Sequence, residues 1–220
     1  MRSILLCVML LLGAGHAGAG QADSSTELPH EILQALTDDL VAAIIQAKGY
    51  FAEEPQRFYA RVDGLLEPVV DYTTFSRAVM GSHGSSKYYK GLATESERQS
   101  YRDQVRRFSD AVRARMVTTL SKGVMTFSDE RIEVVPPDPQ ALERIRGLKS
   151  VTITQLIYRT SEAPLRVEYK LKPDRRGDWK MINVVIGNVN LGKQYRSEFA
   201  SKLQEYGGDI DQVIEYWAQS

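Results

Sequence analysis

The sequence lacks an excess of charge of either sign and has almost no cysteine. Its 220 residues include 28 Lys and Arg against 28 Asp and Glu, so the formal net charge is zero. A nucleic-acid partner or an anionic membrane surface calls for an excess of basic residues, and this composition argues against both. The one cysteine, Cys7, lies in an apolar N-terminal run. A chain cleaved after that run has no disulfide and no thiolate metal ligand.

Long hydrophobic runs are missing as well. No segment reaches the ~18 consecutive apolar residues that indicate a membrane-spanning helix. The N-terminal run over residues 4–12 has nine residues, follows a basic residue and precedes the short segment AGA. This order is typical of a secretory signal peptide. We therefore expect residues 1–22 to be a signal peptide, cleaved after Ala19 or Ala22, and residues 23–220 to form a single exported, soluble domain.

The motifs of common enzymes are absent. After position 22 the sequence has two histidines, His30 and His83, and neither belongs to a metal-binding motif such as HExxH. His83 lies beside serines in SHGSS, but the sequence has no GxSxG elbow of a serine hydrolase. Ser86 stands where a P-loop would need its second glycine. The sequence therefore predicts no catalytic residue, no metal site and no cofactor.

The first half of the chain has a helical period. Apolar residues recur every three or four positions, which predicts helices over residues 28–47, 55–69, 71–81 and 94–123. Thr94 and Glu97 form the capping box of the last of these helices. The intervening segment SHGSSK is typical of a flexible loop.

The spacing of apolar residues then changes from a helical period of 3.6 residues to the period of two residues that is typical of strands. Strands are expected over residues 124–135, 149–159, 164–172 and 178–187, and helices resume after Gly187 and again over 210–217. Helices followed by four consecutive strands with short connections indicate an α+β fold with an antiparallel meander.

The strand expected over 178–187 is apolar on both faces. By strict alternation Trp179, Met181, Asn183 and Val185 share one face, while the other has apolar residues at 182, 184 and 186. An antiparallel strand usually leaves one face in water. Helices, a partner or a bound apolar ligand must therefore cover the second face.

Three segments, found in this order, resemble the MlaC or toluene-tolerance family. They are DYTTFSRAVMG from position 71, KYYKGLATESERQSY from position 87 and VEYKLKPDRRGDWKMINVVIGNVNLGKQYRSEF from position 167. The third segment is the most specific, and its matching residues are Gly177, Trp179, Lys180, Gly187, Asn190, Tyr195 and Arg196. Asn183 and Asn190 stand where the family often has Asp and Ser, and residues 82–86 look like an insertion. The likeness extends over residues 30–217.

The resemblance implies both a fold and a function. The fold would be a curved four-stranded antiparallel sheet wrapped by helices, similar to the nuclear-transport-factor-2 type, with an apolar cavity for acyl chains. The protein would be a periplasmic phospholipid carrier that maintains outer-membrane lipid asymmetry, with phospholipid as cargo. Its partners would be an inner-membrane ABC complex, through its MCE-domain protein, and an outer-membrane lipoprotein complex. A monomer that binds no nucleic acid is expected.

The cavity wall is expected on the sheet and on one helix. The candidate lipid-binding residues are Val79, Ile153, Ile157, Val167, Tyr169, Leu171, Met181 and Val185. For Val167, Tyr169, Leu171, Met181 and Val185 the alternative is that they are plain core. Tyr169 is the best candidate, because its hydroxyl can reach a wet rim while its ring packs.

Five motif residues are expected to be structural, and they are Trp179, Gly187, Asn190, Tyr195 and Arg196. Tyr195 and Arg196 would support the turn between Gly187 and Asn190, and Gly187 would allow a positive φ.

Two other functions stay open from the residues alone. The same type of fold can host an enzyme with a buried acid, although Asn183 occupies the most suggestive inward position and an amide cannot act as the base. A cargo-free adaptor of an envelope complex is the third alternative.

Overall fold

A computed structural model describes residues 27–125, 130–159 and 163–219. The signal peptide expected over residues 1–22 lies outside the described residues. The described part of the chain forms eight helices and five strands. The helices are α1 (Pro29–Ala47), α2 (Pro55–Leu66), α3 (Tyr72–Val79), α4 (Ser86–Gly91), α5 (Glu95–Val124), α6 (Pro139–Arg146), α7 (Leu191–Glu205) and α8 (Ile210–Gln219). The strands are β1 (Arg131–Val134), β2 (Val151–Tyr158), β3 (Leu165–Pro173), β4 (Trp179–Ile186) and β5 (Val189–Asn190).

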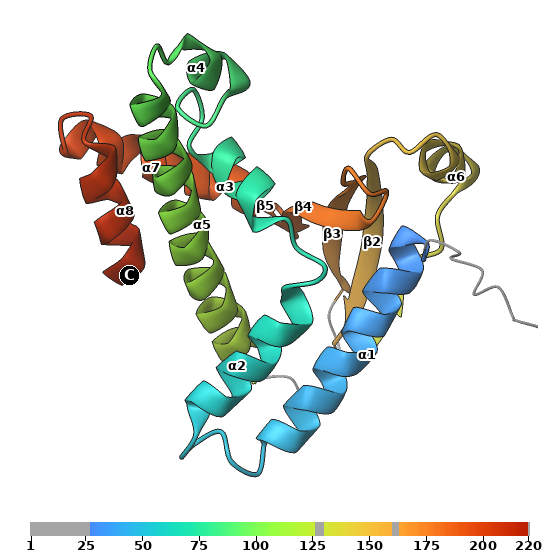
Figure 1. The fold of residues 1–220 in the computed structure, drawn as a ribbon. Coiled ribbons are helices and arrows are strands. Elements are labelled where there is room, and N and C mark those ends of the chain that lie inside the picture. The colour runs from blue at the N-terminus through green and yellow to red at the C-terminus, as the bar shows by residue number, and fades with distance from the viewer. Residues whose placement is uncertain (1–26, 126–129, 160–162, 220) are drawn as a thin grey trace, which may run out of the picture.

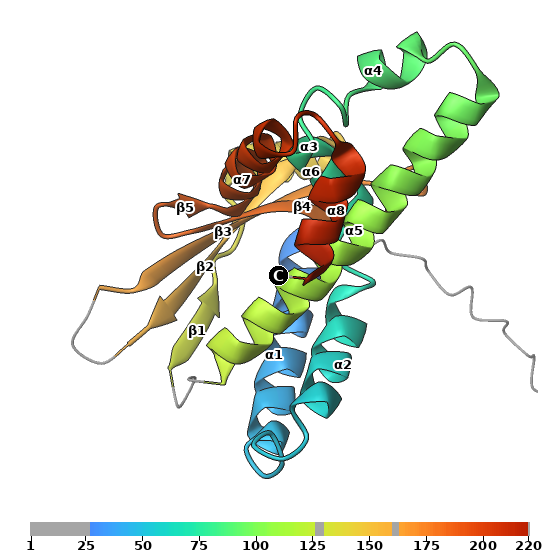
Figure 2. The ribbon, with the colours of Figure 1, turned by 90° about the vertical axis from the view of Figure 1, so that its left-hand side faces the viewer.

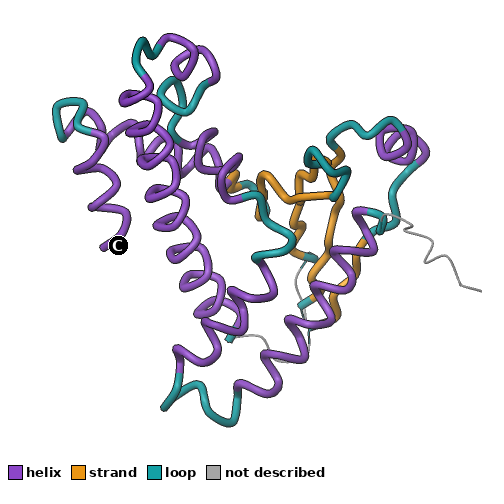
Figure 3. Tube along the Cα trace, in the orientation of Figure 1, coloured by secondary structure: helices purple, strands orange, loops and turns teal. Residues whose placement is uncertain are grey.

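The expected α+β class is confirmed, and the sheet has one strand more than predicted. The strands form a single antiparallel sheet in the order β1-β2-β3-β4-β5. The fifth strand has only two residues, too few to produce a detectable alternation in the sequence. Figure 3 shows the strands gathered on one side of the molecule and a group of helices on the other.

Two apolar clusters divide the molecule. The first joins the inner face of the sheet to α1 and α2, and α1 crosses in front of the strands in Figure 1. The second joins α3, α5, α7 and α8, away from that face of the sheet (Figure 2). The 30-residue helix α5 reaches both clusters, since Val117 belongs to the first and Phe108 to the second. α5 is therefore the element that ties the two halves together.

Arginines of α5 reinforce this arrangement. Arg113 makes a two-pronged ion pair with Asp63 of α2, at 2.6 and 2.9 Å. Arg115 donates to Glu198 of α7 at 2.8 Å, and its guanidinium lies 4.4 Å from the centre of the Trp217 ring of α8. These contacts fix α2, α7 and α8 around a single long helix.

A β-bulge in β4 changes which side chains face the core. Met181 lies opposite Leu171, but Asn183 lies opposite Lys170, so one extra residue is inserted in β4. Beyond the bulge the alternation is reversed. Val184 therefore faces the core opposite Tyr169, whereas Val185 lies on the outer face of the sheet. The prediction that Met181 and Val185 share a face was wrong, because strict alternation cannot anticipate an inserted residue.

A helix lies against the outer face of β4. The first turn of α7 packs there, and the Gly192 N–H donates to Asn183 Oδ1 at 3.0 Å. The same bulge places Asn183 outside the core, so the inward position expected for it was wrong.

The edge of β4 away from β3 is paired in two places. Val69 O accepts from the Met181 N–H at 2.7 Å, and the Asp71 N–H donates to Met181 O at 2.9 Å. The segment after α2 therefore pairs with the first half of β4, while β5 pairs with the second half. This covering leaves no long exposed edge there.

The capping box of Thr94 and Glu97 is confirmed at the start of α5. The loop expected over 82–87 contains a turn and the start of α4, which Ser85 caps by accepting from the Tyr88 N–H at 3.1 Å. A Cβ on Gly84 would overlap the Arg77 carbonyl oxygen, so this turn packs tightly against α3.

Two boundaries differ from the prediction in the segment that leads to the sheet. α5 continues to Val124, so the strand expected over 124–135 is reduced to β1, and residues 126–129 lie outside the described part. Helix α6 was not predicted, although Asp138 caps it by accepting from the Ala141 N–H at 2.7 Å and Pro139 follows as its first residue. None of the helices in the described ranges is long and apolar enough to cross a membrane.

Candidate functional site

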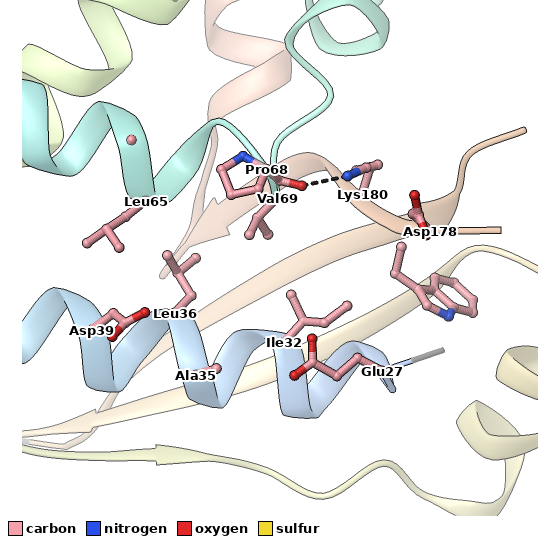
Figure 4. A pocket seen from close by; sticks show the side chains of 12 residues that line it. Glu27, Ile32, Ala35, Leu36, Asp39, Leu65, Pro68, Val69, Asp178 and Lys180 are labelled. Atoms are coloured by element: carbon pink, nitrogen blue, oxygen red, sulfur yellow. Dashed lines mark hydrogen bonds between the residues drawn. The ribbon is translucent and has the colours of Figure 1, made fainter. Parts of the chain in front are cut away.

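A groove of about 620 Å³ runs between α1, the end of α2 and the start of β4. Figure 4 shows side chains of α1 facing those of the α2–α3 connection across it. The residues that line the groove are Glu27, Ile32, Ala35, Leu36, Asp39, Gly64, Leu65, Pro68, Val69, Asp178, Trp179 and Lys180.

The helical period explains how α1 supplies one wall. Ile32, Ala35, Leu36 and Asp39 are spaced three, four and seven residues apart, which places them on one face of the helix. The opposite wall comes from the last turn of α2 and the segment that pairs with β4. The three chain segments therefore meet only in the folded protein.

The apolar wall of the groove is continuous with the core. Leu36 and Trp179 are buried members of the first cluster, and Ile32, Leu65 and Val69 pack against it. The groove is thus a surface opening onto the same apolar cluster that covers the inner face of the sheet.

Charged groups lie at the ends of the groove. Glu27, Asp178 and Lys180 lie toward one end and Asp39 toward the other, with apolar side chains between them (Figure 4). The Lys180 ammonium donates to the Pro68 carbonyl oxygen at 2.6 Å. A ligand with a long apolar part and a polar end would match this distribution.

Four predicted cavity residues lie together on the inner face of the sheet. They are Ile153, Val167, Leu171 and Met181, and each is at most 4% exposed in the first cluster. Ile157 lies at the far end of the same face and is half-buried. None of these five lines the groove. Among all predicted site residues only Trp179, expected to be structural, does so.

Tyr169 also lies on this face, but its hydroxyl does not reach a wet rim. The hydroxyl donates to Gln155 Oε1 at 2.8 Å, and Gln155 Nε2 donates to Thr37 Oγ1 at 2.7 Å. Thr37 in turn donates to the Leu33 carbonyl oxygen of α1 at 2.6 Å. Burial raises the pKa of the Tyr169 hydroxyl. This chain of hydrogen bonds joins the sheet to α1 inside the core.

Two predicted cavity residues lie elsewhere. Val79 is fully buried in the second cluster, among α3, α5, α7 and α8. Val185 lies on the outer face of the sheet because of the bulge. The structure therefore does not bring Val79 and Val185 together with the inner-face residues.

The motif residues Gly187 and Asn190 build the entry into α7. Gly187 has a φ of 57°, as expected for a left-handed turn. Asn190 caps α7 by accepting from the Lys193 N–H at 3.0 Å, and it also accepts from Asn183 Nδ2 at 3.1 Å. The two asparagines that depart from the family pattern thus contact each other at this cap.

Tyr195 and Arg196 do not support that turn. Tyr195 packs edge-on against Phe75 and Trp217 in the second cluster, with ring centres 5.9 and 5.0 Å apart. The Arg196 guanidinium lies over Gly81, at the end of α3. Both residues therefore pack α7 against its neighbouring helices, and the expected role at the turn was wrong.

Ala35, Gly64 and Pro68 line the groove and were missed. The sequence offered two weak signals for them. The apolar stripe of α1 is wide, and Gly64 occupies a helical position where most larger residues would be more favourable than glycine. In the described ranges, no group of three or more His, Cys, Asp or Glu side chains could hold a metal ion.

Comparisons with known proteins agree with this architecture. The toluene tolerance protein Ttg2D of Pseudomonas putida is 26% identical over 195 residues, which cover 88% of this chain and 81% of that protein. A solved structure of a phospholipid-binding protein from Ralstonia solanacearum, in complex with a phospholipid, superimposes with a TM-score of 0.61. It is 16% identical, and the match covers 86% of this chain and 94% of that one, which indicates a shared fold. The family model described as MlaC protein matches residues 34–219. The chain therefore belongs to the MlaC family.

Proposed function

We propose that this protein is a periplasmic phospholipid carrier without enzymatic activity, and that acyl chains bind in the groove between α1, α2 and β4. The observation that carries the proposal is the apolar groove wall, which is continuous with the first core cluster. The volume of the groove, about 620 Å³, lies within the ~300–1,000 Å³ of typical ligand sites. Family membership and the phospholipid complex of the Ralstonia protein support the choice of cargo.

The inner face of the sheet would accept the deeper part of the cargo. Leu171 and Met181 lie beneath α1, which is joined to the sheet by the hydrogen bonds between Thr37, Gln155 and Tyr169. If acyl chains replaced the apolar contacts between α1 and the sheet and these polar contacts broke, α1 would move outward and the groove would extend toward the sheet. The predicted cavity residues of the inner face would then become its inner wall.

A carrier of this kind needs direct contact with its partners. Burial of each CH₂ is worth roughly 0.8 kcal/mol, so one 16-carbon chain accounts for about 12 kcal/mol. Release of such a chain into water would be slow. We therefore propose transfer by contact with an MCE-domain protein of an inner-membrane ABC complex and with an outer-membrane lipoprotein complex, which would maintain outer-membrane lipid asymmetry. Loaded protein should lose labelled lipid much faster to the MCE-domain protein than to buffer.

Two substitutions on α1 test the groove. Ala35 lines it and is exposed, so Ala35→Trp should fill the groove while the fold remains intact. Ala42 lies two turns further along the same side of the helix and is also exposed, but it does not line the groove. Ala42→Trp is therefore the matched control.

The measurement is phospholipid per protein after organic extraction and mass spectrometry. We expect wild type and Ala42→Trp to carry phospholipid and Ala35→Trp to carry much less. Equal loading of all three would place the cargo elsewhere. If wild type contains no phospholipid and also takes up none from vesicles, the adaptor or enzyme alternative would be favoured.

The predicted signal peptide has its own test. The N-terminus of the purified exported protein should be Gly20 or Asp23.

A further inference from the structure

One end of the groove carries charges of both signs that lack ionic partners. Glu27 and Asp178 supply carboxylates there and Lys180 an ammonium group (Figure 4). Across the described ranges, none of these three side chains forms a salt bridge. The hydrogen bond of Lys180 goes to the uncharged carbonyl oxygen of Pro68. All three charges therefore stay available to a ligand.

A second lysine stands beside Lys180. Lys172 of β3 lies directly opposite Lys180 of β4 in the sheet register. Like charges directly opposite each other destabilise a pair of strands. Lys172 does not itself line the groove, but its place opposite Lys180 puts a second basic residue next to this end, where a bound anion would reduce the repulsion between the two lysines.

The mixture of acidic and basic side chains at this end of the groove discriminates between classes of polar headgroup. A headgroup that is only anionic would meet Lys172 and Lys180, but also the carboxylates of Glu27 and Asp178. A headgroup that carries both a phosphate and an ammonium can pair with both kinds of side chain. Such charge-assisted contacts are stronger than neutral hydrogen bonds.

We propose that this end of the groove selects zwitterionic phospholipids over anionic ones. Lys180 and Lys172 bind the headgroup phosphate, and Glu27 and Asp178 bind its ammonium group. The proposal rests on the proposed function, because it names the headgroup of the lipid whose chains occupy the groove.

The test is a competition for loading. Delipidated protein is incubated with vesicles made of equal parts phosphatidylethanolamine and phosphatidylglycerol, and the protein-bound lipids are quantified by mass spectrometry. We expect wild type to be enriched in phosphatidylethanolamine by about two- to five-fold, the size that one or two partly exposed ion pairs supply. Soluble glycerophosphoethanolamine should not displace the lipid, since the acyl chains contribute most of the binding.

Three variants assign the effect to these side chains. The double variant Glu27→Gln/Asp178→Asn should reverse the preference toward phosphatidylglycerol, because both lysines remain. Lys180→Gln should lower the loading of both lipids. Lys170→Gln is the control, since Lys170 lies on the same strand as Lys172 but stands opposite Asn183, away from Lys180.

The outcomes separate the two proposals. Normal total loading with equal amounts of both lipids, or a double variant with the preference of wild type, would overturn headgroup selection while leaving the carrier function intact. Displacement by soluble glycerophosphoethanolamine would show a site for the free headgroup and overturn the proposed lipid site. Absence of any bound lipid would overturn both proposals.

Discussion

Gly64 offers the sharpest test of the groove, because stability and lipid binding should change in opposite directions. It lies in the last turn of α2, is exposed and lines the groove. A Cβ built on Gly64 meets no atom within 4 Å. An alanine therefore fits without a clash, and a larger side chain would extend from this Cβ toward the space assigned to the cargo.

The size of both effects can be worked out. Glycine inside a helix is about 0.8–1.0 kcal/mol less favourable than alanine, and leucine is nearly as favourable as alanine. Gly64→Ala and Gly64→Leu should therefore each raise the free energy of unfolding by about 1 kcal/mol. Leucine adds four carbon atoms, which would displace about four CH₂ groups of the cargo at roughly 0.8 kcal/mol each. Gly64→Leu should thus weaken lipid binding by about 3 kcal/mol, or roughly two orders of magnitude.

The assay pairs two measurements on delipidated protein. Urea denaturation gives the free energy of unfolding, and uptake of labelled phospholipid from vesicles gives the affinity. Gly64→Ala is the control, since it shares the gain in stability and displaces only about one CH₂, a change of about four-fold. A Gly64→Leu protein that is more stable and binds lipid like wild type would refute the assignment of the groove as the acyl site.

Three further predictions concern the core, the cap of α7 and the dependence on pH. Leu171 is fully buried, so Leu171→Ala should lower the free energy of unfolding of delipidated protein by about 2–5 kcal/mol; a loss well below 1 kcal/mol in urea denaturation would identify a loosely packed pocket wall instead. A Cβ at Gly192 would lie 2.6 Å from Asn183 Oδ1, so Gly192→Ala should destabilise the protein by about 1–3 kcal/mol, and Asn183→Ala should recover part of that loss; the same cost in both backgrounds would disprove the clash. Burial lowers the pKa of His83 below its ordinary 6.5, against the opposing hydrogen bond of Gln104, so the unfolded chain binds the proton more readily than the folded one. Stability should therefore fall as the pH drops below about 6.5 toward the lower folded pKa, and be unaffected by this group at higher pH. Denaturation at pH 5 to 8 should show that His83→Gln loses this part of the slope, and identical pH profiles would contradict it.

The proposed movement of α1 assigns a function to the buried polar contacts, which would hold α1 against the sheet until lipid binds. Thr37, Gln155 and Tyr169 connect α1 to the sheet by hydrogen bonds. A buried hydrogen bond is worth about 1 kcal/mol net, so this connection is modest beside the roughly 12 kcal/mol of a bound acyl chain. Lipid binding can therefore offset the loss of these hydrogen bonds, and acyl chains would replace the apolar contacts that α1 makes with the sheet.

The sequence by itself determined most of the local structure and the family. Periodicity located α1, α2, α3, α5, α7 and α8, because an amphipathic helix carries its burial pattern within one segment. Residue types alone predicted the positive φ of Gly187 and the capping box of α5. The third quoted segment was specific enough to identify the family to which residues 34–219 are matched.

Only the tertiary structure decided which side chains share a surface. One inserted residue in β4 sends Val184 to the core and Val185 to the outer face, and the pairing with Lys170 and Leu171 that fixes this bulge is not local in sequence. The groove likewise forms where α1, the end of α2 and the start of β4 meet. Each of its residues has an ordinary local pattern, and their proximity arises from packing between segments far apart in the chain.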